Sequence, residues 1–256
     1  MAITAAMVKE LREMTGAGMM DCKKALTNTD GDMDAAVEFL RENGLAKAAK
    51  KAGRIAAEGL VAVAVSEDAK EAAIVEVNSE TDFVAKNDTF RTYVAEVADQ
   101  ALTTKAADIE GFLAEESKAE AGKTVKEALD GKIAVIGENL NIRRFAKVSA
   151  ADGFVASYIH AGGKIAVIVE FATDSKDAAL VECGKNVAMQ IAAMNPIAVD
   201  EDGVSEEIKQ KEIEVAIDKT KAEQVQKAVE AALKKAGINP AHVDSEDHME
   251  SNMAKG

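Results

Sequence analysis

The 256-residue sequence is poor in the residue types from which most catalytic and metal-binding sites are built. Its two cysteines, Cys22 and Cys183, are too few and too far apart for a disulfide framework or a CxxC metal site. We expect both to be buried thiols in a reducing compartment. The HExxH, GxSxG and P-loop motifs are absent, and the three histidines, His160, His242 and His248, lack metal-ligand spacing. These absences argue against an enzyme and predict no metal and no cofactor.

Basic residues are outnumbered, with 31 Lys and Arg against 45 Asp and Glu, and the net charge is -14. Phosphate binding depends on clustered Lys and Arg, so we expect no direct contact with nucleic acid or with anionic membranes. No apolar run approaches transmembrane length, and charged residues directly follow Met1–Met7, which argues against a signal peptide. The sequence therefore predicts a soluble cytoplasmic protein whose partner is another protein.

Residues 1–44 have the pattern of a three-helix docking domain. Thr4 can cap a first helix, and Gly16 permits the tight reversal that ends it. A second helix is expected over Met19–Leu26, and a third that ends near Asn43-Gly44.

Residues 45–58 follow as a basic linker. Lys47, Lys50, Lys51 and Arg54 recur at helical spacing, which places four positive charges along one face. This face is either a solvated linker helix or a surface that meets an acidic partner.

An internal repeat of roughly ninety residues defines the architecture of the next part of the chain. Gly59–Ala62 reappears as Gly153–Ala156, and Ala72–Val77 reappears as Ala166–Phe171. Each copy has the pattern strand, turn, strand, loop, helix, and a two-stranded hairpin needs further strands or a helix to cover its apolar face.

The covering helices are expected over Phe90–Leu102 and Lys176–Met194. The sequence thus predicts an α+β fold in which antiparallel sheets with covering helices occur twice. The first core subdomain is placed at 59–150 and the second, incomplete one at 151–198.

The segment between the two copies contains a polar helical stretch, Glu110–Ala121, a turn at Ile136–Asn139 and a strand over Asn141–Val148. Arg143 and Arg144 are adjacent in that strand. We expect them to point to opposite faces, one exposed and one in a salt bridge, rather than to form a phosphate site.

The loop Asn78–Asn87 places an apolar ring, Phe83, among acids, amides and hydroxyls. In one interpretation Phe83 and Val84 tuck under the following helix as core; in the other the ring contacts a partner. The second copy joins strand to helix with the shorter Ala172–Ser175 and has no aromatic residue there. The longer loop therefore carries something extra, which favours a functional contact for Phe83.

Residues 199–256 are predicted to form a helical hairpin. A long helix is expected over about Ser205–Lys235 with a thin apolar stripe at seven-residue spacing, and Gly237–Pro240 is a turn. The returning arm, from Ser245 through Met249 and beyond, is much shorter than the first, so we expect the hairpin and the chain to be truncated. A helix this polar needs a partner helix, which leaves oligomerisation through the arm open.

Three strings carry a resemblance to a known family. Thr15–Leu26 and Thr81–Asn87 are long and specific, and Ile136–Asn139 followed by Ile142-Arg143-Arg144 adds a third match. On these strings the chain resembles bacterial elongation factor Ts.

The resemblance implies a ubiquitin-associated-type three-helix domain, a doubled α+β core and a nucleotide exchange factor that promotes GDP release from elongation factor Tu. It implies that Asp82 and Phe83 wedge near the magnesium and phosphate site of the Tu G domain. The other partner-binding positions that it implies are Ile136, Gly137 and His160, which support that contact, and Arg12, Met19 and Met20, which dock on a G-domain helix. The alternative is a non-catalytic adaptor or structural protein that binds partners through the three-helix unit and the helical arm.

Overall fold

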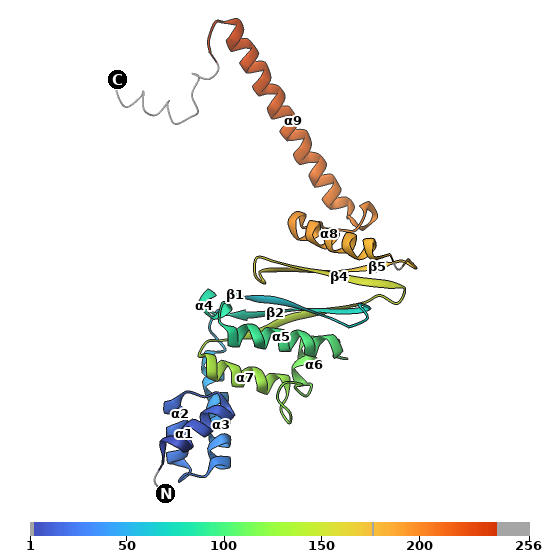
Figure 1. Ribbon diagram of the computed structural model, residues 1–256. Coiled ribbons are helices and arrows are strands. Elements are labelled where there is room, and N and C mark those ends of the chain that lie inside the picture. Colours follow the sequence, from blue (N-terminus) through green and yellow to red (C-terminus); the bar gives the residue numbers. More distant parts are fainter. Residues whose placement is uncertain (1–2, 176, 240–256) are drawn as a thin grey trace, which may run out of the picture. The chain divides into compact units, whose positions relative to one another are not determined.

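The computed structural model describes residues 3–175 and 177–239, and the chain divides into two units, Met1–Asn195 and Pro196–Gly256. The first unit is an α+β structure of helices and small antiparallel sheets (Figure 1). This confirms the predicted fold class. None of the described helices is long and apolar enough to cross a membrane.

The first unit begins with three helices, α1 (Ala5–Thr15), α2 (Met19–Asn28) and α3 (Met33–Lys51). Thr4 caps α1, and Gly16 ends it in the left-handed conformation with φ of 66°. The helices share a small core of their own, formed by Val8, Leu11, Cys22, Ala25, Leu26 and Ala36.

The third helix does not end near Asn43-Gly44, so that prediction is wrong. It continues to Lys51, and Gly44 is buried at a close approach to a later helix, α7 (Val125–Ile136). A Cβ on Gly44 would lie 3.3 Å from the Ala134 Cβ. Gly44 therefore permits helix packing rather than a stop, and the first half of the predicted basic linker, residues 45–51, extends α3.

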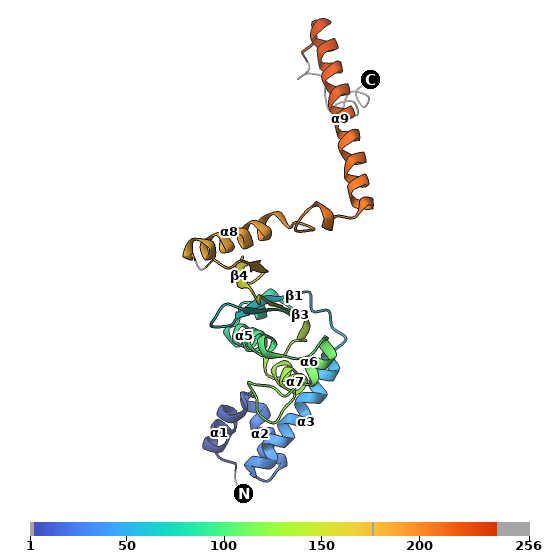
Figure 2. The ribbon, with the colours of Figure 1, turned by 90° about the vertical axis from the view of Figure 1, so that its right-hand side faces the viewer.

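The α+β core is layered (Figures 1 and 2). Its first sheet pairs β1 (Glu58–Val65), β2 (Glu71–Ser79) and β3 (Asn141–Ser149) in the antiparallel order β1-β2-β3. The helix α5 (Asp88–Thr103) packs on one face, and a second hairpin, β4 (Gly153–His160) with β5 (Ile165–Ala172), packs on the other.

The remaining helices complete the layers on both sides. α8 (Ala178–Met194) covers the far face of the second hairpin, whereas α6 (Ile109–Ala114) and α7 lie on the side of α5 (Figure 1). The prediction of a polar helix over Glu110–Ala121 is mostly wrong, because α6 ends at Ala114 and a loop follows. Cys183 is exposed on α8, which corrects the prediction that both thiols are buried.

The two hairpins confirm the internal repeat at the level of backbone geometry. Gly59 and Gly153 begin them with φ of 134° and 143°, a conformation that favours glycine. A Cβ would lie 2.2 Å from the Val77 oxygen in the first copy and 1.7 Å from the Phe171 oxygen in the second. Both glycines therefore serve the same close approach of neighbouring strands.

The arginine pair Arg143-Arg144 does not alternate as predicted. Arg144 lies opposite Glu76 while Ile142 lies opposite Val77, so the strand bulges at Arg143. Both arginines are exposed, and both reach Glu76, at 3.4 and 2.7 Å. The expectation of one exposed and one paired arginine is wrong because the bulge breaks the alternation.

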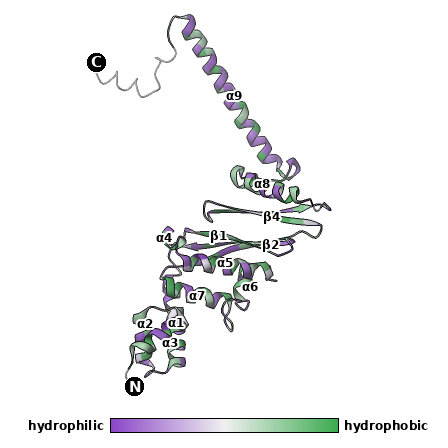
Figure 3. Ribbon diagram, in the orientation of Figure 1, coloured by the Kyte–Doolittle hydropathy of each residue, from purple (hydrophilic) through white to green (hydrophobic). Residues whose placement is uncertain are grey.

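The second unit contains a short 3-10 helix, Glu201–Gly203, and the long helix α9 (Glu206–Lys235) that begins at the cap Ser205. This confirms the predicted long helix. None of its residues is buried, and Figure 3 shows it as mostly hydrophilic with scattered hydrophobic residues. The predicted returning arm lies outside the described residues.

The glycine at the start of the first hairpin gives a test of the fold. Gly59→Ala should lower the free energy of unfolding by about 2–4 kcal/mol, because the methyl group meets a backbone oxygen in a strained conformation. Gly131→Ala, inside α7 with no atom within 4 Å of the added Cβ, is the matched control and should gain up to about 1 kcal/mol. Urea unfolding of both variants measures this, and a Gly59→Ala protein as stable as the parent would contradict the assignment.

Candidate partner-binding site

The loop between β2 and α5 contains one turn of helix, α4 (Asp82–Ala85), which is called the tip below. The Thr81 side chain caps it by accepting from the Val84 backbone N–H at 3.4 Å. Asn87 then caps α5 by accepting from the N–H groups of Thr89 and Phe90. The polar residues of this loop therefore serve as helix caps that hold a short, ordered turn.

Phe83 points into solvent from this turn, with 81% of its surface exposed. Ala85 is buried, and Val84 packs against the main core. Because successive helical residues point about 100° apart, burial of these two positions turns the preceding ring outward. The interpretation of Phe83 as core is wrong, whereas Val84 is half-buried and packs against the core.

A reciprocal pair of carboxylates braces the tip against the turn that follows α7. The Glu138 carboxylate accepts from the Thr81 N–H at 3.0 Å and from the Thr81 hydroxyl at 2.6 Å. In return, the Glu80 carboxylate accepts from the Asn139 N–H at 2.6 Å. These bonds, called the carboxylate brace below, join residues 57 and 59 positions apart in the chain.

The brace holds the end of α7, where Ile136 and Gly137 lie, close to the tip. Gly137 ends α7 in the left-handed conformation with φ of 89° and is exposed, whereas Ile136 is half-buried against the main core. The backbone thus turns sharply beside the tip and leaves Gly137 open to a partner.

The end of the predicted basic face also joins the brace. The Asn139 side chain donates to the Arg54 carbonyl at 2.7 Å, and the Arg54 guanidinium lies 3.5 Å from Glu80. Partial burial lowers the pKa of Lys51, and the nearby Arg54 charge lowers it further. Because Lys47 pairs with Asp21 at 2.8 Å, the face is partly neutralised within the protein.

Ile55, which follows Arg54, is an exposed residue that the sequence analysis did not single out. Its side chain is 85% exposed, similar to Phe83. The signal available in the sequence was an isoleucine between Arg54 and two alanines, which does not distinguish an exposed side chain from a buried one.

The second hairpin contributes His160 at the same end of the core. Lys164, in the β4–β5 turn, donates to the Glu58 carboxylate at 2.6 Å and to the Gly59 carbonyl at 3.2 Å. Glu58 lies opposite Ser79 in the sheet register, so this turn is held near the end of β2 from which the tip extends. His160 is exposed, and its Nδ1 lies 3.1 Å from the Tyr158 hydroxyl.

Asp82, the other predicted residue of the tip, is engaged within the turn. Lys86 donates to its carboxylate at 2.7 Å, and this bond, with a contribution from the charge of Lys164, lowers the pKa of Asp82. The carboxylate is half-exposed. A partner that binds the Asp82 carboxylate has to displace Lys86 from this surface ion pair.

Arg12, Met19 and Met20 are each exposed on the three-helix unit, apart from the tip. Met19 and Met20 are 59% and 74% exposed. A groove of about 600 Å³ lies between this unit and α7. Its lining includes Met14, Gly16, Val37, Leu40 and Val135.

The chemistry of these surfaces is that of binding. Within the described residues, no cluster of three or more His, Cys, Asp or Glu side chains could hold a metal ion. The exposed groups are a phenylalanine, methionines, an isoleucine and paired charges, presented on braced backbone. Exposed apolar side chains on ordered backbone are typical of surfaces that bind other proteins.

Comparison with known proteins gives the family. Residues 80–248 match the family model described as Elongation factor TS. The chain is 57% identical over 213 residues to Elongation factor Ts of Clostridioides difficile (strain 630), covering 83% of this chain and 69% of that protein. It is 52% identical to Elongation factor Ts of Clostridium novyi (strain NT), with coverage of 91% and 78%. For Elongation factor Ts of Bacteroides fragilis (strain YCH46) the identity is 51%, with coverage of 100% and 74%. The chain belongs to the elongation factor Ts family of translation elongation factors.

The brace gives a test of how the tip is held. Glu138→Ala should lower the free energy of unfolding by about 1–3 kcal/mol, because it leaves the Thr81 N–H without its carboxylate acceptor. It should also speed amide exchange over residues 81–85. Glu67→Ala, an exposed glutamate in the β1–β2 turn, is the control and should change stability by less than about 0.5 kcal/mol. Equal exchange over 81–85 in parent and Glu138→Ala would show that the brace does not hold the tip.

Proposed function

We propose that this chain is a guanine nucleotide exchange factor that promotes GDP release from elongation factor Tu. Asp82 and Phe83 insert near the magnesium and phosphate site of the Tu G domain, with Ile136, Gly137 and His160 beside them. The observation that carries the proposal is the 81% exposure of Phe83 on a turn that the protein itself braces. The factor catalyses no chemical step, and its action takes place in the cytoplasm without nucleic acid.

Exchange of this kind is a coupling between two binding events. A factor that binds nucleotide-free Tu more tightly must weaken nucleotide binding by the same ratio. A weakening of about ten-thousand-fold requires roughly 5.5 kcal/mol, whereas burial of one phenylalanine gives about 1.5–3 kcal/mol. Phe83 therefore cannot supply the whole effect.

The remaining free energy needed to weaken nucleotide binding comes from the other contact surfaces. Arg12, Met19 and Met20 dock on a G-domain helix, and Ile55 adds apolar area beside the brace. Because the tip is already ordered in the free protein, little entropy is lost when it inserts, and more of the contact energy reaches the partner.

A second candidate function is that of an adaptor that binds proteins through the three-helix unit and the helical arm. The observation that favours it is α9, of whose 30 residues none is buried. An adaptor would bind its partners without changing the rate at which Tu releases nucleotide, so a release assay separates the two functions.

Removal of the ring should reduce exchange without affecting the fold. Phe83→Ala should slow release of labelled GDP from preloaded Tu by roughly 10- to 100-fold at a fixed concentration of factor, the equivalent of one lost apolar contact. Its thermal unfolding should match the parent, since the side chain is exposed. Ile197→Ala, which truncates a side chain that is 69% exposed in the second unit, is the control for loss of surface area.

Two results would contradict this assignment. If Phe83→Ala accelerated release as well as the parent, the wedge would be wrong while the exchange function could stand. If the parent chain left the release rate unchanged, the exchange function itself would be wrong.

Met19 and Met20 should affect affinity rather than the maximal effect. Met19→Ala combined with Met20→Ala should raise the factor concentration needed for half-maximal GDP release by about tenfold or more, because two exposed apolar anchors are lost. The release rate at saturating factor should stay close to that of the parent, because the tip is intact. A reduced rate at saturation with unchanged half-maximal concentration would place these residues in the wedge instead.

A further inference from the structure

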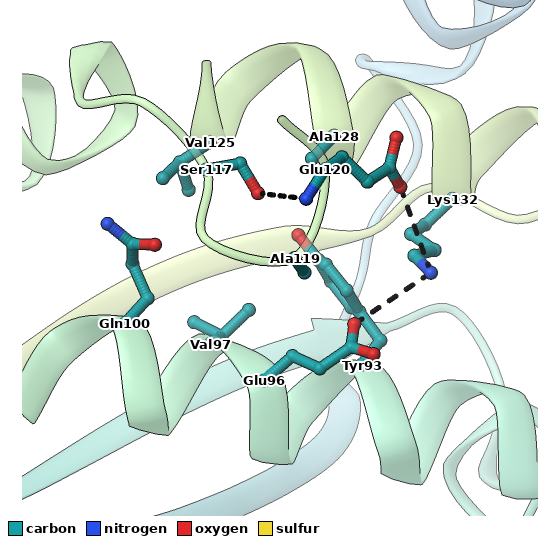
Figure 4. A pocket seen from close by; sticks show the side chains of 10 residues that line it. All are labelled: Tyr93, Glu96, Val97, Gln100, Ser117, Ala119, Glu120, Val125, Ala128 and Lys132. Carbon is teal, nitrogen blue, oxygen red and sulfur yellow. Dashed lines mark hydrogen bonds and ion pairs between the residues drawn. The ribbon is translucent and has the colours of Figure 1, made fainter. Parts of the chain in front are cut away.

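A small cavity lies between α5, α7 and the segment that joins α6 to α7, away from the tip. Its volume is about 20 Å³. Figure 4 shows the Tyr93 ring rising from α5 toward the segment of Ala119 and Glu120, with the Lys132 ammonium group between two carboxylates. The polar side chains that line it are Tyr93, Glu96, Gln100, Ser117, Glu120 and Lys132.

Two buried oxygens in this cavity have no hydrogen-bond partner within the described part of the chain. They are the Tyr93 hydroxyl and the Glu96 Oε2. Tyr93 is only 3% exposed, so bulk water does not reach its hydroxyl. A buried hydroxyl or carboxylate oxygen without a hydrogen bond is destabilising, so two such atoms at one cavity call for a further hydrogen-bonding group.

Lys132 does not take that role. Its ammonium nitrogen lies 3.9 Å from Glu96 Oε2 and 3.9 Å from Glu120 Oε1, beyond hydrogen-bond distance in both cases. The same nitrogen lies 5.6 Å from the centre of the Tyr93 ring. Polar contacts of this length suggest a bridging molecule.

The volume and the charges select the kind of molecule. A single water requires at least about 10–15 Å³ and two to four polar partners, and the cavity meets both conditions. A second cation would be repelled by Lys132, which already neutralises part of the acidic charge. Burial raises the pKa of Tyr93, and the charges of Glu120 and Glu96 raise it further. The phenol therefore stays protonated and acts as a donor.

We propose that this cavity is a binding site for one structural water, which accepts from the Tyr93 hydroxyl and donates to Glu96 Oε2. The second lone pair of the water faces Lys132, and its second hydrogen faces the carboxylate of Glu120. This arrangement uses two donors and two acceptors around one molecule. It does not depend on the proposed exchange function.

The water links the helices that carry the two sides of the tip. Tyr93 and Glu96 lie on α5, which follows α4, and Lys132 lies one turn before Ile136 at the end of α7. A molecule bonded to both helices fixes their spacing, and with it the register between the tip and the carboxylate brace.

A high-resolution crystal structure of the parent chain tests the proposal, compared with Tyr93→Phe and with Tyr158→Phe. The parent should show one density peak about 2.7–3.2 Å from both Tyr93 Oη and Glu96 Oε2. Tyr93→Phe should lose the peak, whereas the control Tyr158→Phe, which removes an exposed hydroxyl, should keep it. In solution, nuclear Overhauser transfer from water to the ring protons of Tyr93 should report a long-lived contact.

Two outcomes would overturn the proposal. One is a Tyr93 hydroxyl bonded directly to a protein group, with no density in the cavity and no transfer from water. The other is an anomalous peak at the site after soaking with thallium(I), which would identify the occupant as a monovalent cation.

Discussion

The carboxylate brace is the interaction on which the arrangement of the tip depends. Glu138 holds the N-terminus of α4, and Glu80 holds the backbone after Gly137, so each turn supplies the carboxylate that the other needs. Charge-assisted bonds to backbone N–H groups are stronger than neutral ones and fix geometry closely. On a loop without these bonds, the Phe83 ring would fold back against the protein surface. With both turns held by carboxylates, the ring stays exposed to solvent.

A difference between the two copies of the core accounts for how the tip is held. Both hairpins begin with a glycine pressed against the neighbouring strand, Gly59 and Gly153, and both carry a covering helix. Within residues 3–175 and 177–239, only the first hairpin gains a third strand, β3, and the turn before β3 carries Glu138 and Asn139. The additional strand therefore brings the brace to the longer loop, whereas the second copy keeps a plain helix cap at Asp177.

Features set by neighbours in the sequence could be predicted from it. The cap at Thr4, the repeated strands and the long α9 follow from local patterns, and the order of modules with the strings around Phe83 indicated the family. Features set by contacts between distant residues could not. Gly44 looks like a helix end until Ala134 packs on it, and the bulge at Arg143 depends on the register of β3 against β2. The exposure of Ile55 likewise depends on which elements leave that segment uncovered.

The central claim is that Phe83 is exposed and ordered in the free protein and becomes buried in the partner. Incorporation of a fluorinated phenylalanine at position 83, followed by fluorine NMR, measures this directly, because Phe90 and Phe112 provide buried references in the same chain. The account predicts a resonance that responds to replacement of H₂O by D₂O in the free protein and loses that response when nucleotide-free elongation factor Tu is added. A resonance at position 83 that stays sensitive to solvent in the complex, while the chain is fully bound, would contradict the account.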